Sequence, residues 1–298
     1  MKLDIRKIMV PVDFSETSEH ATDHAAWLAA ATQADLMLVH VLPPNHYYFE
    51  SPEPFVVPEN QDEVRRDVET KIKLIARGLS DKYNINPGYR ILQGKVSYEL
   101  LDLANEEHID LIMMGTHGAK GLEEILIGSN AQHLVSKAPC PVITFQQEKR
   151  QPGFSNIVLP IDRSRHSREK VGVAINVALL CNSKIHIVGL LNNDDESEYR
   201  KLQVVLDQVQ MAIDRSEISC TRHTVKGDNI ASEAMKYAAS ISADLILILT
   251  EDESVMGKLD LGPLSKHIVN HSPIPVMSLN PHYGSFEALD LTGAYTAY

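Results

Sequence analysis

The segment IRKIMVPVDF at residues 5–14 has a counterpart in FSNIVLPIDR at residues 154–163, and this repeat indicates how the chain is built. Both are apolar runs that end in Pro-x-Asp. Pro11 therefore corresponds to Pro160, and Asp13 to Asp162, at an offset of 149 residues. Such self-similarity indicates a duplicated unit rather than one large domain.

Two later pairs of segments support the duplication. DLIMMG at residues 110–115 matches DLILIL at residues 244–249, and PCPVITF at residues 139–145 matches PIPVMSL at residues 273–279. Both pairs share an offset of 134 residues, so chance similarity does not explain them.

The two offsets differ because the first half carries extra chain. The surplus falls on residues 43–60, a Pro-rich and aromatic stretch that is typical of an inserted loop. Its aromatic cluster either shields a ligand or partner surface or packs locally; the cluster consists of Tyr47, Tyr48 and Phe49. We expect a first domain at residues 1–147, a second at 153–281 and a tail at 282–298.

Each half alternates short apolar strands with longer helical segments. The strands expected are residues 7–11, 36–42, 89–92, 111–114, 142–145, 157–161, 185–191, 220–225, 245–249 and 276–279. The helices expected are residues 18–32, 62–82, 97–107, 130–137, 167–181, 196–214, 229–241 and 264–270. This alternation predicts an α/β fold in which each half is a doubly wound parallel sheet covered on both faces.

The composition narrows the class of protein. The 298 residues carry a net charge of −12, and both halves are acidic, so neither nucleic acid nor an anionic membrane is expected as the main partner. The three cysteines form no CxxC pair and are expected to be reduced thiols. No apolar run approaches the roughly 20 residues that cross a bilayer. These features predict a cytoplasmic protein.

A glycine-rich loop follows the expected strand at residues 111–114. Its spacing is Gly115-x2-Gly118-x9-Gly128-Ser129, ahead of an expected helix. Glycines let backbone N–H groups approach a phosphate, and a helix start favours an anion. Asp13 should lie beside this loop at the carboxyl edge of the sheet. The alternatives are that Ser129 only forms a capping box with Gln132, and that Asp13 only caps the first helix.

The Pro-x-Asp strand ends and this loop resemble the universal stress protein family, in its ATP-binding, tandem form. The resemblance is strong over residues 1–145 and weaker over residues 154–280. It implies two Rossmann-like domains, each with a five-stranded parallel sheet of order 3-2-1-4-5. It also implies a pseudo-dimer of the two domains in which residues 142–145 meet residues 276–279.

The same resemblance implies ATP as ligand, with Mg²⁺ held mainly by phosphate oxygens and water. The residues that it places around ATP are Pro11, Val12, Asp13, Val41, Met114, Gly115, His117, Gly118, Gly128, Ser129 and Asn130. His117 is expected to contact phosphate rather than to donate a proton. Two chains are further expected to form a homodimer.

The loop of the second half, residues 249–267, departs from this pattern. Thr250 is aligned with Gly115, and Pro263, which donates no N–H, stands in place of Ser129. Three carboxylates also lie where phosphates would bind; they belong to Glu251, Asp252 and Glu253. We expect no ordinary ATP binding there, although the retained Asp162 leaves another ligand open.

The sequence shows no nucleophile–base arrangement and no Walker motif, and Lys120 does not occupy a Walker position. The pairs His20/His24 and His267/His271 have metal-ligand spacing but no nearby third ligand, so no protein-held metal is expected. We therefore expect an ATP-binding regulatory module, acting on an unidentified protein partner, with at most weak ATP hydrolysis. The alternatives are a slow ATPase that acts as a timer, and a scaffold whose second domain binds a metal or another small ligand.

Overall fold

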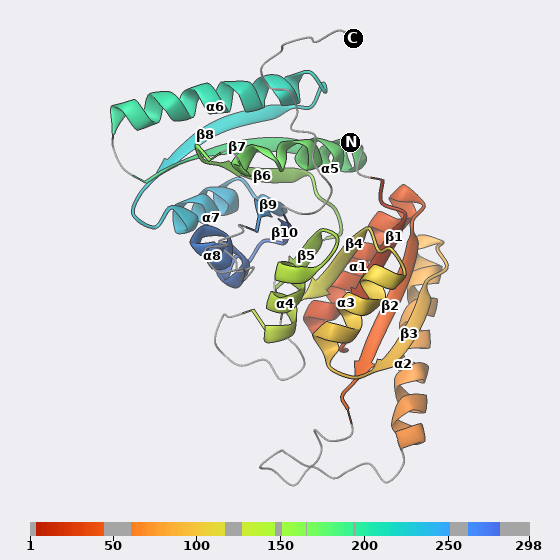
Figure 1. Cartoon of the computed structure of the whole chain (residues 1–298). Coiled ribbons are helices and arrows are strands. Elements are labelled where there is room, and N and C mark those ends of the chain that lie inside the picture. The colour runs from red at the N-terminus through yellow and green to blue at the C-terminus, as the bar shows by residue number, and fades with distance from the viewer. Residues whose placement is uncertain are drawn as a thin grey trace, which may run out of the picture. The chain divides into compact units, whose positions relative to one another are not determined.

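The computed structural model describes residues 4–44, 61–116, 127–146, 151–164, 166–192, 195–250 and 262–280 (Figure 1). The chain from Ile5 to Pro152 contributes one compact unit, and the chain from Gly153 onward contributes the other. The aromatic cluster of the insertion and the tail at residues 282–298 lie outside the described residues. The expected domain limits stay predictions.

The first unit alternates strands and helices throughout. Its elements are β1 (Lys7–Pro11), α1 (Glu16–Thr32), β2 (Asp35–Leu42), α2 (Gln61–Tyr83), β3 (Gly88–Gln93), α3 (Val96–Glu106), β4 (Leu111–Gly115), α4 (Ser129–Lys137) and β5 (Val142–Phe145). All neighbouring strands are parallel, in the order β3-β2-β1-β4-β5. The sheet order implied by the resemblance, 3-2-1-4-5, is confirmed for this unit.

The second unit repeats the pattern. Its elements are β6 (Asn156–Ile161), the 3-10 turn η2 (His166–Arg168), α5 (Val171–Cys181), β7 (Lys184–Leu191), α6 (Glu196–Asp214), β8 (Cys220–Lys226), α7 (Ile230–Ser240), β9 (Leu245–Leu249), α8 (Pro263–His271) and β10 (Val276–Leu279). Its parallel strands lie in the order β8-β7-β6-β9-β10, which is the same topology.

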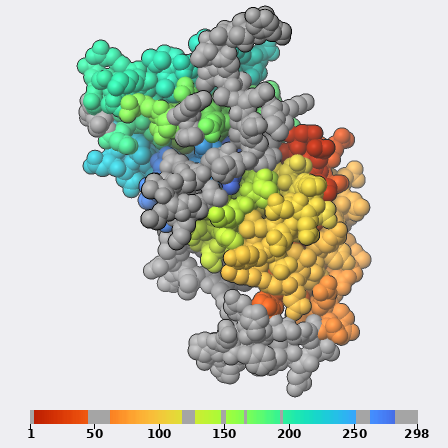
Figure 2. Space-filling view, viewed as in Figure 1, coloured from red at the N-terminus to blue at the C-terminus, as the bar shows by residue number. Residues whose placement is uncertain are grey.

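Helices cover both faces of each sheet. In the first unit α1 packs against α2 and on β1 and β4, while α3 packs against α4 (Figure 1). Figure 2 shows α3 and α4 as one continuous yellow-to-green surface. Because both faces are covered, the central strands are apolar along their length: Ile8, Met9 and Val10 of β1 are fully buried.

The aspartate that opens each DLI repeat ties two strands together. Oδ2 of Asp110 accepts hydrogen bonds from the backbone N–H groups of Arg6 and Lys7, both at 2.9 Å. In the second unit Asp244 accepts from the N–H groups of Ser155 and Asn156, at 2.8 and 2.9 Å. The repeat seen in the sequence therefore marks a shared clamp between the starts of the first and fourth strands of each sheet.

One predicted helix is wrong at its beginning. Residues 167–181 were expected to form a single helix, but η2 covers the start and α5 begins only at Val171. The remaining elements are confirmed to within about two residues at their ends. Cys140 is buried, and burial raises the pKa of its thiol to about 12.

Within the described residues, no helix has the length and apolarity needed to cross a membrane. The cytoplasmic location, the homodimer and the pairing of residues 142–145 with residues 276–279 stay predictions.

Candidate functional site

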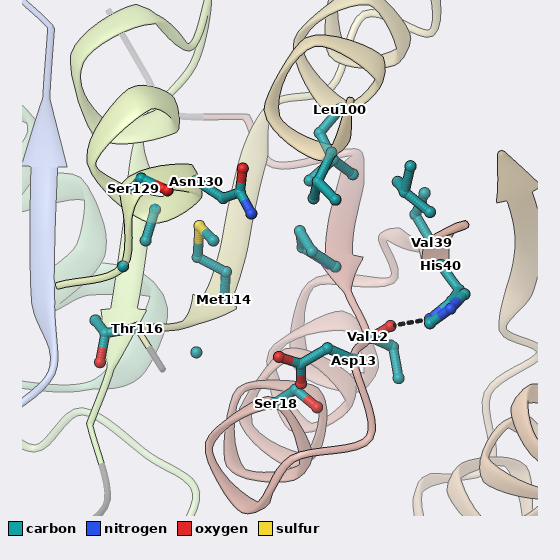
Figure 3. A pocket seen from close by; sticks show the side chains of 16 residues that line it. Val12, Asp13, Ser18, Val39, His40, Leu100, Met114, Thr116, Ser129 and Asn130 are labelled. Atoms are coloured by element: carbon teal, nitrogen blue, oxygen red, sulfur yellow. Dashed lines mark hydrogen bonds between the residues drawn. The ribbon is translucent and has the colours of Figure 1, made fainter. Parts of the chain in front are cut away.

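A cavity of about 260 Å³ lies in the first unit, at the carboxyl ends of β1, β2 and β4 and beside the start of α4 (Figure 3). Nine of the residues expected around ATP line it: Pro11, Val12, Asp13, Val41, Met114, Gly115, Gly128, Ser129 and Asn130. The other two, His117 and Gly118, lie outside the described residues, as does Lys120. This edge of a doubly wound sheet is where ligands of such folds bind.

The sequence analysis missed seven residues that also line the cavity: Ser18, Val39, His40, Val96, Leu100, Thr116 and Ala131. Most of them are apolar or small and carry no motif. His40 had a weak signal, since it is a polar residue near the carboxyl end of an otherwise apolar strand.

Asp13 is held by the turn that begins α1. Its Oδ1 accepts hydrogen bonds from the backbone N–H of Ser15, at 3.0 Å, and from the Ser15 hydroxyl. Ser15, not Asp13, is the N-cap of α1, since its side chain accepts from the N–H of Ser18 at 3.3 Å. Oδ2 of Asp13 has no hydrogen bond to the described residues, and the side chain is exposed next to Ser18 (Figure 3). One carboxylate oxygen is thus available to a ligand.

Two glycines let the end of β4 and the start of α4 come close to their neighbours. A Cβ on Gly115 would stand 2.5 Å from Oγ1 of Thr17 and 2.9 Å from the backbone N of Ser18. A Cβ on Gly128 would stand 3.0 Å from the carbonyl oxygen of Thr116, to which the Gly128 N–H donates at 2.9 Å. Any side chain at position 115 would push the first turn of α1 away from the cavity.

The start of α4 corrects the expected capping box. The N-cap is Gly128, without a side-chain capping bond, and Ser129 is already the first helical residue. The Ser129 hydroxyl is therefore not used for capping. The first N–H groups of a helix have no partner within it, and here they border the cavity together with the side chain of Asn130 (Figure 3). Such a helix start attracts an anion.

The other walls of the cavity are apolar. Val39 and Leu100 are buried, and with Val41 and Met114 they form a surface that suits a flat, weakly polar ring. The cavity therefore offers an apolar wall, one carboxylate oxygen and a helix start. This set of groups suits a molecule that joins a planar base to hydroxyls and an anionic group.

His40 connects the ends of two strands. Its Nδ1 lies 2.6 Å from the carbonyl oxygen of Val12, which is the dashed contact in Figure 3. Its ring also packs on Phe14, with 5.0 Å between ring centroids. Phe14 has a φ of +65°, a left-handed conformation that is uncommon for a residue other than glycine. The histidine thus helps to hold the turn that presents Asp13.

The stability of the first unit should depend on pH through His40. Burial lowers the pKa of His40 from 6.5. As the pH falls below 6.5, His40 takes up a proton in the unfolded chain, whereas burial opposes its protonation in the folded unit. The stability that is present above pH 6.5 is therefore progressively lost. We expect His40→Gln to lose less stability than the parent chain between about pH 7.5 and about pH 5.5, measured by urea unfolding. Equal losses in both proteins would contradict this. Some loss remains in the variant, since burial also lowers the pKa of His24.

The corresponding turn of the second unit is preserved. Oδ1 of Asp162 accepts from the N–H of Ser164 at 2.8 Å, and the hydroxyl of Ser164 accepts from the N–H of Ser167 at 3.1 Å. The cavity beside this turn nevertheless has a volume of only about 20 Å³. Both units therefore have this turn, but the cavity beside it is much smaller in the second unit.

Larger side chains fill that space. Leu249 and Leu264 occupy the positions of Gly115 and Asn130, and Lys170 occupies that of Ala21. Leu249 stands where the first unit leaves no room for a Cβ between the end of β4 and the first turn of α1, and α5, the counterpart of α1, begins late, at Val171.

The alignment of Thr250 with Gly115 is wrong by one residue. The N–H of Thr250 donates to the carbonyl of Leu279, at 2.8 Å, as the N–H of Thr116 donates to that of Phe145, at 2.9 Å. Thr250 therefore corresponds to Thr116, and Leu249 to Gly115. The three acidic residues that follow Thr250 lie outside the described residues.

Within the described ranges, no three metal-ligating side chains gather into a candidate metal site. Nδ1 of His24 lies 3.0 Å from the carbonyl oxygen of His20. His267 and His271 stack with 4.3 Å between ring centroids. Each pair thus has local contacts of its own.

Comparison with known proteins places both halves in one family. The sequence model of a protein family, described as "Universal stress protein family", matches residues 4–146 and again residues 153–279. Universal stress protein MJ0531 of Methanocaldococcus jannaschii is 28% identical over 148 residues, which is 49% of this chain and 85% of that protein. Universal stress protein A homolog 1 of Coxiella burnetii is 31% identical over 140 residues, which is 46% of this chain and 94% of that protein.

A solved structure shares the fold of the whole chain. The universal stress protein from Archaeoglobus fulgidus DSM 4304 has a TM-score of 0.70 and 19% identity, and the match covers 94% of this chain and 97% of that one. The tandem arrangement that the resemblance implied is thus found in a protein of known structure.

Proposed function

The chain belongs to the universal stress protein family, and from that membership and the cavity of its first unit we propose that it binds ATP there and acts as a nucleotide-dependent regulatory module. The observation that carries the proposal is the gathering of nine expected residues around one cavity. The second unit would not bind a nucleotide in this way, because larger side chains fill the corresponding space.

Each part of ATP has a counterpart in the cavity. The adenine ring would lie against the apolar wall of Val39, Val41 and Leu100. Oδ2 of Asp13 would accept a hydrogen bond from a ribose hydroxyl. The phosphates would lie at the start of α4, near the Ser129 hydroxyl, where helix N–H groups favour negative charge.

Mg²⁺ would accompany the phosphates rather than be held by the protein alone. Among the described residues that line the cavity, Asp13 alone carries a carboxylate. Its Oδ1 already accepts two hydrogen bonds from Ser15. A single remaining oxygen suits an ion whose other ligands are phosphate oxygens and water.

The proposal is tested by calorimetric titration of the full chain with Mg-ATP. We expect one ATP per chain, and an affinity that falls about tenfold to a hundredfold in Asp13→Asn, since a hydrogen bond to a charged acceptor is lost. The asparagine keeps an Oδ1 acceptor for Ser15, so the turn should persist. Asp162→Asn is the matched control in the second unit and should bind ATP as the parent does.

Two results would overturn the proposal. A chain that binds no ATP, and whose melting temperature ATP does not raise, has no site of this kind. An affinity that falls equally in both aspartate variants would place the effect elsewhere than in the first cavity. Phosphate release measured in the same samples separates a binding module, which shows no turnover, from the slow ATPase alternative.

A further inference from the structure

A second cavity of the first unit lies between α1 and α2. Its volume is about 380 Å³, larger than the 260 Å³ of the first cavity and within the usual range for small-molecule sites. Val12 and Ser18 border both cavities, so the start of α1 stands between them. Nothing in the proposed nucleotide site requires this space.

The wall of the second cavity contains a helical glycine that no packing contact explains. Gly78 lies inside α2, where glycine lowers helix stability relative to alanine. A Cβ at this position would meet no atom within 4 Å. The glycine is therefore not needed for close packing; it is exposed and borders the cavity, where a larger side chain would take up open space.

A second unfavourable feature lies on the same wall. His20 is only 9% exposed, and its buried Nδ1 has no hydrogen-bond partner. An unpaired buried polar atom costs stability. His20 lines the cavity with other atoms of its side chain, since its Nδ1 exposes almost no surface. The glycine inside a helix at the same wall is the feature expected of a binding site rather than of a packed core.

The charges and rings of the wall indicate the class of ligand. Asp23 is paired, since it accepts from Nζ of Lys82 at 2.6 Å and from the Tyr83 hydroxyl at 2.8 Å. Glu19 has no such partner among the described residues, so the wall carries one uncompensated negative charge. The apolar side chains of Ile75 and Leu79 and the imidazole of His20 offer an apolar and aromatic contact surface.

We propose that this cavity is a second ligand site, which binds a small aromatic amine. The aromatic ring lies between the apolar side chains of α2 and the imidazole of α1, and the ammonium group pairs with Glu19. An anionic ligand of the same size is repelled by that carboxylate.

Tryptamine and indole-3-propionate test this class, because they share a ring and a two-carbon arm and differ in the sign of their charge. With the full chain saturated by ATP, we expect tryptamine to bind at one site per chain, at least about tenfold more tightly than indole-3-propionate. Equal affinity for the two probes would overturn the charge argument. Displacement of tryptamine by ATP would place the probe in the first cavity and overturn the proposal.

Substitutions at the helical glycine test the location. Gly78→Leu fills the cavity and should weaken tryptamine binding about tenfold or more, with a melting temperature at or above that of the parent. Gly78→Ala is the matched control, which leaves most of the space and should bind tryptamine within about threefold of the parent. Glu19→Gln should reduce the preference for tryptamine over indole-3-propionate. Unchanged tryptamine binding by Gly78→Leu contradicts the proposed site.

Discussion

Gly115→Leu should weaken ATP binding by about a hundredfold or more, because it rebuilds in the first unit the obstruction that the second unit already has. A Cβ at this position would lie 2.5 Å from Oγ1 of Thr17 and 2.9 Å from the backbone N of Ser18. The first turn of α1 has to move, and with it Ser18, which lines the cavity. Calorimetric titration with Mg-ATP measures the loss.

The variant should still fold. The second unit accommodates Leu249 at the matching position, with its cavity reduced to about 20 Å³. We expect a stability cost of about 1–3 kcal/mol, as for other overpacked sites. Gly88→Ala is the control, since a Cβ there meets only the carbonyl oxygen of Leu36, at 3.9 Å. ATP affinity within about threefold of the parent in Gly115→Leu would refute the role given to this glycine.

Asp110→Ala should lower the free energy of unfolding of the first unit by about 2–4 kcal/mol. The aspartate accepts hydrogen bonds from two backbone N–H groups, those of Arg6 and Lys7, where β1 begins. Removal of the carboxylate takes this acceptor from both groups. Urea unfolding followed by circular dichroism measures the change.

Two further variants separate the clamp from a general effect of substitution. Asp110→Asn keeps an acceptor oxygen and should cost less than half as much as Asp110→Ala. Asp244→Ala removes the equivalent clamp of the second unit and should destabilise that unit while ATP still binds the first. A loss below about 0.5 kcal/mol in Asp110→Ala would mean that water replaces the carboxylate without penalty.

The features of the fold and of the site that the sequence predicted well depend on residues that are neighbours along the chain. The apolar run at β1 and the Pro-x-Asp that follows it place Asp13 at the carboxyl edge of the sheet, and nine expected residues gather around one cavity there. The repeated DLI and Pro-x-Pro segments likewise predict the fourth and fifth strands of both units. Strand order followed from a family resemblance, since no local pattern specifies which strands are neighbours.

The features that the sequence did not predict depend on contacts between segments that lie far apart along the chain. The late start of α5 at Val171 accompanies Leu249 in place of Gly115, and Leu249 lies far along the chain from α5. The hydrogen bond between Thr250 and Leu279 agrees with the offset of 134 residues, which pairs Gly115 with Leu249 and not with Thr250. The role of His40 rests on the carbonyl of Val12, just after the neighbouring strand β1, so no motif within β2 indicates it.

The small cavity of the second unit, about 20 Å³, bears on how a chain would respond to changing ATP levels. Cooperative binding requires at least two sites that share a conformational equilibrium. A tandem chain with one nucleotide site fills along a simple hyperbola, and its signal is graded rather than a threshold. Any steeper response has to come from the association of several chains, so the steepness of the ATP titration reports on assembly.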